Sequence, residues 1–126
     1  PVRTFTAGSF GGMSRNLASL DQQFRPYAEY LVQVARTYLG PTTVTSTRRT
    51  WAAQAGLYQE YLAGRRPLPV APPERSRHVW GLAVDLVVGK YRAGGPPSPE
   101  MQALGEWWQK SGGVWGGKAD PVHFSA

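Results

Sequence analysis

The stretch "SRHVWGLAVDLVV", residues 76–88, decides how the chain can fold. Residues 82–88 form a short apolar run that predicts a buried β-strand. Asp85 interrupts this run, and an ionised carboxylate is costly to bury unless something compensates its charge. His78 lies seven positions earlier, too far along a straight strand or a rigid helix for both side chains to bind one ion. A turn at Gly81 would bring His78 back onto the strand.

The composition describes one small, basic domain without cysteine. The chain has 126 residues, enough for a single modest core. No apolar stretch approaches the roughly 20 residues needed to span a bilayer. The absence of cysteine excludes disulfides, thiolate nucleophiles and cysteine-ligated metal sites. The net charge of +6 predicts attraction to polyanions such as nucleic acid, anionic lipid or an anionic cell wall, unless it serves only solubility.

The N-terminal residues show neither a regular period nor an export signal. Residues 1–13 are rich in glycine and threonine, which predicts an irregular arm. The stretch "PVRTFTAGSFGG" lacks the apolar segment of a signal peptide. The chain begins at Pro1, which fits either a trimmed protein or an excised domain.

Apolar periodicity and turn signals predict helices over 16–39, 50–64 and 99–110, and strands over 42–47, 82–88 and 122–125. Asp21 or Pro26 divides the first helix, and Thr50 caps the second. The apolar stripe of the second helix consists of Trp51, Ala55, Tyr58 and Leu62. Because helices and strands do not alternate strictly, we expect an α+β fold with a short, mostly antiparallel sheet packed with about three helices.

The two histidines of the chain, together with Asp85, suggest a metal site. His123 in "DPVHF" follows Asp120 by three positions. Two imidazoles and one carboxylate make a three-ligand zinc site with a fourth position open for water, which is typical of catalytic zinc. Such a site would compensate the charge of Asp85. From spacing alone, His78 and His123 could also be ordinary core or surface residues.

Three motifs resemble those of the zinc peptidoglycan peptidases. This family includes D-Ala-D-Ala dipeptidases and carboxypeptidases, and the L-alanyl-D-glutamate endopeptidases of phage endolysins. "SRHVWGLAVDL" is similar to S-x-H-x-x-G-x-A-x-D-L, "STRRTWAAQAGLY" to S-x-x-R-[ST]…Q-x-x-L-[YF], and "WGGKADPVHF" to W-G-G…D-x-x-H-F. The motifs follow the family's order over residues 46–124. The resemblance implies that residues 1–126 form one zinc peptidase catalytic domain, with the zinc site at one edge of the sheet.

Position by position, the resemblance implies a role for each matched residue. His78, Asp85 and His123 would hold one zinc ion. Asp120 matches the catalytic carboxylate, which takes a proton from the attacking water and returns it to the leaving amine. The alternative for Asp120 is a turn or capping aspartate. Arg49 matches the arginine that polarises the scissile carbonyl.

Three further residues are expected near the substrate. Ser76 matches a residue that binds polar groups of the substrate, and Gln54 would support the site. Trp115 lies within a motif and could line the cleft, although core packing is the commoner use of tryptophan. Arg48, the neighbour of Arg49, is expected to be merely solvated.

The closing motif favours an L-alanyl-D-glutamate endopeptidase. Carboxypeptidases of the family more often have glutamate where this chain has Asp120. Two departures flank the cleft: Ser125 replaces the usual glutamate or glutamine, and the stretch between Gly117 and Asp120 is short. The alternatives are a D-Ala-D-Ala carboxypeptidase and a non-catalytic zinc-holding domain that binds the wall.

The expected partner is the stem peptide of peptidoglycan, with anionic wall polymers as a further partner. We expect a monomer that acts on the bacterial cell wall after secretion or phage delivery. Nucleic acid is not an expected partner, because the positive residues occur mostly as singles and pairs without interleaved aromatics.

Overall fold

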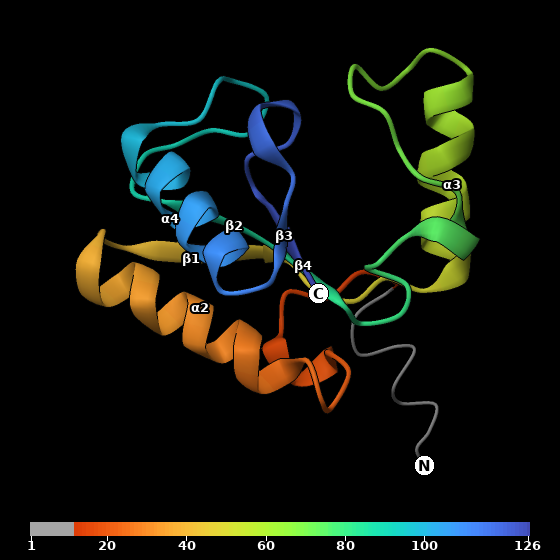
Figure 1. Ribbon diagram of the computed structural model, residues 1–126. Helices are drawn as coiled ribbons and strands as arrows, with labels where there is room; N and C mark the ends of the chain where they lie inside the picture. The colour runs from red at the N-terminus through yellow and green to blue at the C-terminus, as the bar shows by residue number, and fades with distance from the viewer. Residues whose placement is uncertain (1–11) are drawn as a thin grey trace.

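A four-stranded sheet with the order β1-β2-β4-β3 forms the centre of the computed structural model, which describes residues 12–126 (Figure 1). The strands are Thr42–Ser46 (β1), Ala83–Val88 (β2), Val114–Trp115 (β3) and His123–Ser125 (β4). All three strand pairs are antiparallel. The predicted α+β fold with a small antiparallel sheet is therefore confirmed. The arm predicted for residues 1–13 lies outside the described residues, apart from its last two.

The α-helices of the described chain are Arg25–Tyr38 (α2), Trp51–Leu62 (α3) and Pro99–Lys110 (α4). Single 3-10 turns lie at Leu17–Ser19 (η1), Pro73–Arg75 (η2) and Gly117–Ala119 (η3). Helices α2 and α4 pack against the sheet, whereas α3 stands apart from them beyond one end of the sheet (Figure 1). Within residues 12–126, no helix combines the length and the apolar character that a membrane crossing requires.

The hydrophobic core lies between the sheet and the helices α2 and α4. Leu31 of α2, Leu104 of α4 and Phe124 of β4 are almost fully buried in it. Strand β2 contributes every second residue: Val84 and Leu86 point into the core, as side chains alternate along a strand. Asp85 lies between them and therefore points to the opposite face of the sheet. The apolar run around Asp85 thus does not place its carboxylate in the core.

The first predicted helix is divided, as its sequence indicates. The α-helix begins only at Arg25, because the carboxylate of Asp21 accepts hydrogen bonds from the amides of Gln23 and Phe24 just before it. Pro26 occupies the first turn, where its missing N–H costs no helical hydrogen bond.

Helix α3 forms where it was predicted, and Thr50 caps it by accepting a hydrogen bond from the amide of Ala53. Its predicted apolar stripe, however, is not its buried face. Trp51 and Leu62 are 52% and 58% exposed, whereas Gln54 is buried. The reason is that α3 packs beside η2 rather than on the core, so its inward face meets a polar pocket.

Candidate metal centre

Two neighbouring strands and one turn bring three potential metal ligands together. Asp85 on β2 and His123 on β4 are direct partners in the strand register. Gly81, with a φ of +72°, makes the turn that returns His78 to the strand. A Cβ at Gly81 would lie 2.6 Å from the backbone nitrogen of Asp21, so the turn requires glycine. Potential ligand atoms of His78, Asp85 and His123 all lie within 4.8 Å of one another.

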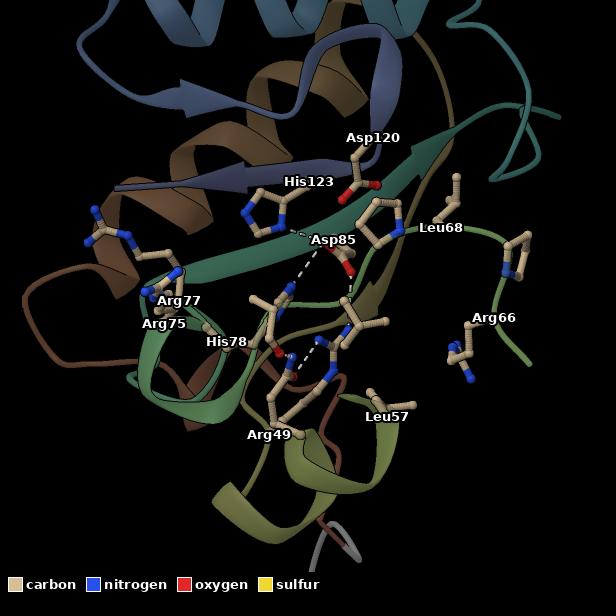
Figure 2. Close-up of a pocket in the computed structure, with 16 residues that line it drawn as sticks. Arg49, Leu57, Arg66, Leu68, Arg75, Arg77, His78, Asp85, Asp120 and His123 are labelled. Carbon is tan, nitrogen blue, oxygen red and sulfur yellow. Dashed lines mark hydrogen bonds and ion pairs between the residues drawn. The ribbon is translucent and has the colours of Figure 1, made fainter. Parts of the chain in front are cut away.

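Both imidazoles face the same carboxylate oxygen. Asp85 Oδ1 lies 3.2 Å from His78 Nε2 and 3.2 Å from His123 Nδ1 (Figure 2). His78 Nδ1 lies 2.6 Å from the carbonyl oxygen of Thr47. A carbonyl oxygen can only accept a hydrogen bond, so Nδ1 carries the proton of this bond. His78 Nε2 faces Asp85: it donates to the carboxylate when it also carries a proton, and otherwise presents a lone pair that a cation between the two groups would join to Asp85.

This donor set fits a metal ion. Two imidazole nitrogens and one carboxylate oxygen are ligands that zinc accepts, and a backbone carbonyl commonly orients the second nitrogen of a ligating histidine. Among residues 12–126, no other histidine, aspartate or glutamate cluster meets the same criterion. His78, Asp85 and His123 could therefore hold one metal ion.

The charge of Asp85 is compensated on both of its oxygens. Arg49 Nη2 lies 3.4 Å from Asp85 Oδ2, the oxygen that neither histidine contacts. Burial, the largest influence on the pKa of Asp85, opposes ionisation, but hydrogen bonds from His123 and His78 hold this pKa well below its usual range. The carboxyl is thus ionised and ready to act as a ligand.

Arg49 is itself fixed by contacts with helix α3 and with Asp85. Its Nη1 donates to Gln54 Oε1 at 3.1 Å, and Gln54 Nε2 donates to the carbonyl oxygen of Ala71 at 2.8 Å. Burial lowers the pKa of Arg49, and the neighbouring carboxylate of Asp85 opposes this effect. The Nε atom is buried without a partner in the described chain.

Asp120 lies beside this group without belonging to it. Figure 2 places its carboxylate near His123 and above Asp85. The amide of His123 donates to the carbonyl of Asp120 at 3.1 Å, and the amide of Gly116 donates back to the carbonyl of His123 at 2.9 Å. A Cβ at Gly116 would lie 2.2 Å from the carbonyl oxygen of Asp120, so the turn is close-packed. Burial, followed by the charge of Asp85, raises the pKa of Asp120.

All of these groups line one pocket, with a cavity volume of about 420 Å³. Its floor consists of His78, Asp85 and His123, flanked by Arg49, Gln54 and Asp120. Residues 66–71 form one side of the pocket, and residues 75–77 line it as well (Figure 2). Apart from Ser76, the sequence did not predict these rim residues, although their arginines and prolines are visible in it.

The residues expected near the substrate do not all reach the pocket. Ser76 and Gln54 are both buried and line it. Trp115 does not: it is 8% exposed, packs in the core and donates from Nε1 to the carbonyl of Pro121 at 2.7 Å. The expectation that Trp115 binds substrate therefore does not match its position. Arg48 is exposed and lies outside the pocket lining, in contrast to Arg49.

The family described as D-alanyl-D-alanine carboxypeptidase matches residues 70–126. This range holds all three potential ligands and Asp120. Over these residues the chain is similar to this family of peptidases. The resemblance stated from the motifs is thus confirmed. Among curated proteins, no sequence matches the chain.

Solved structures of peptidoglycan peptidases share the fold. The LdcB LD-carboxypeptidase has a TM-score of 0.64 at 16% identity, covering 84% of this chain and 58% of its own. The D,D-pentapeptidase VanY, solved in complex with Zn(II), has a TM-score of 0.63 at 22% identity, covering 90% of this chain and 76% of its own. The L-Ala D-Glu endopeptidase ChiX of Serratia marcescens has a TM-score of 0.55 at 25% identity, covering 87% of this chain and 82% of its own. The chain thus spans little more than half the length of LdcB.

Proposed function

We propose that the chain is a zinc peptidase that cleaves the stem peptide of peptidoglycan, and that the scissile bond joins L-Ala to D-Glu. The observation that carries this proposal is the group of His78, Asp85 and His123, whose ligand atoms lie within 4.8 Å on the floor of a pocket. Asp120 and Arg49 line the same pocket, so a proton carrier and a hydrogen-bond donor accompany the ligands.

In this proposal, His78 Nε2, Asp85 Oδ1 and His123 Nδ1 are the zinc ligands. A zinc ion held there would polarise the scissile carbonyl and lower the pKa of a water molecule. Thr47 fixes the orientation of His78 through its carbonyl oxygen, and Arg49 holds the second oxygen of Asp85.

Asp120 moves the proton. When the water oxygen bonds to the carbonyl carbon, the water proton passes to the carboxylate of Asp120. When the carbon–nitrogen bond breaks, the same proton passes to the leaving amine nitrogen. The turn through Gly116 supports this role, since it holds the main chain of Asp120 beside His123 but outside the ligand group.

Arg49 stabilises the negative charge that develops on the carbonyl oxygen. Its guanidinium lines the pocket and is held from two sides, by Gln54 and by Asp85. A donor that is fixed before the reaction stabilises this charge without the cost of reorganisation.

Cleavage of D-Ala-D-Ala by a carboxypeptidase is the second candidate, because the matching family carries that description. We prefer the endopeptidase for two reasons. The closing motif has Asp120 where the carboxypeptidases more often have glutamate, and the L-Ala D-Glu endopeptidase ChiX is 25% identical over 82% of its chain. A non-catalytic zinc-holding domain is less well supported, because such a domain has no need of Asp120 and Arg49 in the pocket.

Mass spectrometry of purified peptidoglycan after digestion tests the proposal. New N-terminal D-glutamate, or its amide, is the expected product. Released D-alanine would identify the carboxypeptidase instead. An intact wall in the presence of zinc-loaded protein would contradict both enzymes and favour the binding domain.

The proposed substrate places the site of action at the bacterial cell wall. The net charge of +6 would favour retention on anionic wall polymers, which are therefore proposed as secondary partners. A role in bacterial lysis, as in phage endolysins, follows if stem-peptide cleavage is extensive enough to open the wall.

A further inference from the structure

We propose that Arg75 and Arg77 together bind a carboxylate and thereby select stem peptides whose D-Glu keeps its free α-carboxylate. This inference rests on the proposed function, because it takes the stem peptide as the substrate. It concerns the choice among such peptides, for which neither the motifs nor the comparisons assign a residue.

Both arginines belong to the pocket, one on each side of Ser76 in the sequence. Their side chains lie on the same side of the metal centre, opposite Leu68 and Arg66 (Figure 2). Both residues are exposed, so a substrate can reach them without displacing other parts of the chain.

The positive charge of these two residues is not used inside the described chain. Neither Arg75 nor Arg77 forms an ion pair with an aspartate or glutamate among residues 12–126. The two other arginines of the pocket are paired: Arg49 with Asp85, and Arg66 with Glu60 at 3.1 Å. Arg75 and Arg77 are therefore the pocket's arginines with charge left for a ligand.

The backbone that carries the pair is fixed relative to the metal centre. The amide of Ser76 donates to the carbonyl of Pro73 at 3.2 Å, which closes the turn η2. The amide of Leu82 donates to the carbonyl of Arg77 at 2.9 Å, which ties the segment to the strand of Asp85. Ser76 itself is 4% exposed. The main chain that carries the two guanidinium groups is thus held in place, one residue before His78 for Arg77 and three residues before it for Arg75.

A carboxylate satisfies this arrangement better than a neutral group. Two guanidinium groups on one side of a pocket repel each other, and an anion between them relieves the repulsion. Guanidinium donates two parallel hydrogen bonds to a carboxylate, which a carboxamide cannot accept in the same way. In the γ-linked D-Glu of the stem peptide, the α-carboxylate is on the carbon that bears the scissile nitrogen. It therefore enters the pocket next to the reacting bond.

Two synthetic peptides test the inference: L-Ala-γ-D-Glu-L-Lys, and the same peptide with an α-carboxamide on D-Glu. Calorimetric titration into zinc-loaded Asp120→Asn protein measures binding without turnover, and kcat/KM of the wild-type chain measures cleavage. We expect the carboxylate peptide to bind about tenfold more tightly, the scale of one hydrogen bond to a charged group. The double variant Arg75→Gln/Arg77→Gln should bind both peptides equally.

Arg65→Gln is the matched control, because Arg65 is an exposed arginine nearby in the sequence that does not line the pocket. It should keep the preference. Equal binding of the two peptides by the wild-type pocket, or an unchanged preference in the double variant, would overturn the inference even if both peptides are cleaved. Preferential binding without cleavage would instead overturn the proposed function alone. If neither peptide binds, both proposals are wrong.

Discussion

The floor and the rim of the pocket are built by different means. The floor, formed by His78, Asp85 and His123, is fixed by the β2–β4 register and by the hydrogen bond from His78 to a backbone carbonyl. The rim, within residues 66–77, contains no strand and only the single turn η2. Two of the three groups that could hold an ion thus come from paired strands and the third from a hydrogen-bonded turn, whereas most of the rim belongs to a loop.

The two regions also differ in how their charges are compensated. On the floor, the carboxylate of Asp85 faces both histidines and Arg49, so it already has partners in the folded chain. On the rim, Arg75 and Arg77 have no such partner among residues 12–126. Substitutions on the rim should therefore change which peptide is cleaved, and substitutions on the floor should change whether any peptide is cleaved.

Removal of a floor ligand has the largest expected effect. His78→Ala or His123→Ala deletes one of three ligand atoms, so zinc should fall from about one per chain to near zero and hydrolysis should stop. Elemental analysis after dialysis measures the zinc. Chelation should abolish wild-type activity, and added zinc should restore it. Arg77→Gln on the rim is the control and should keep its zinc. Full zinc occupancy in either histidine variant would show that the ligands are assigned wrongly.

Asp120→Asn should have the next largest effect and should leave the floor intact. The amide keeps the shape of the side chain but cannot accept the proton, so kcat should fall by about 10²–10⁴-fold while zinc content and fold stay unchanged. Steady-state kinetics and elemental analysis of the same sample check this. Near wild-type hydrolysis by the zinc-loaded variant would contradict the proton-transfer role. Loss of zinc would instead make Asp120 a ligand.

Arg49→Ala should lower kcat by about 10²–10³-fold, the usual scale for loss of one donor to a developing oxyanion. Arg48→Ala, the adjacent control, should change little, because Arg48 is exposed and outside the pocket lining. Kinetics of the two variants with one peptide substrate measure the difference. The opposite ranking would mean that the upstream motif is aligned one residue out of register.

Much of the fold could be predicted from the sequence, because its elements carry local signals. Thr50 caps α3 as expected, and Ser98 caps α4 in the same way, each by accepting a hydrogen bond from an amide in the first turn. Strand β3 was not predicted, because its two residues are too few to show a period and pair only through the tertiary neighbour β4. The prediction of the buried face of α3 was wrong for a related reason. This face lies against a polar pocket, and hydrophobic periodicity does not reveal such a contact.

The ligand group could be predicted, whereas its surroundings could not. Motif spacing and the turn at Gly81 indicated that His78 could reach Asp85, and the structure brings them together. The face of the sheet to which Asp85 points could not be predicted, because an apolar run in the sequence does not show which of its residues point into the core. Apart from Ser76, the rim residues were not predicted. Arginines in a proline-rich loop show no periodicity, and only the folded path of the segment brings them to the pocket.

Gln54 joins the two regions, and its substitution should have the smallest of these effects. Its Oε1 accepts from Arg49 beside the floor, while its Nε2 donates to the carbonyl of Ala71 on the rim. Gln54→Ala removes both bonds from a buried site, so the free energy of unfolding should fall by about 1–3 kcal/mol. Zinc should remain, and hydrolysis should fall less than in Arg49→Ala. Denaturant unfolding and kinetics measure the two changes.

The variant Gln54→Glu separates the floor from the rim. A glutamate still accepts from Arg49, but as an anion it cannot donate to the carbonyl of Ala71. If the floor governs chemistry and the rim governs substrate contact, this variant should keep kcat close to wild type and raise KM several-fold, whereas Gln54→Ala should change both. If Gln54→Glu instead lowers kcat as strongly as Arg49→Ala does, Gln54 acts on the substrate itself, and the separation between floor and rim does not hold at this residue.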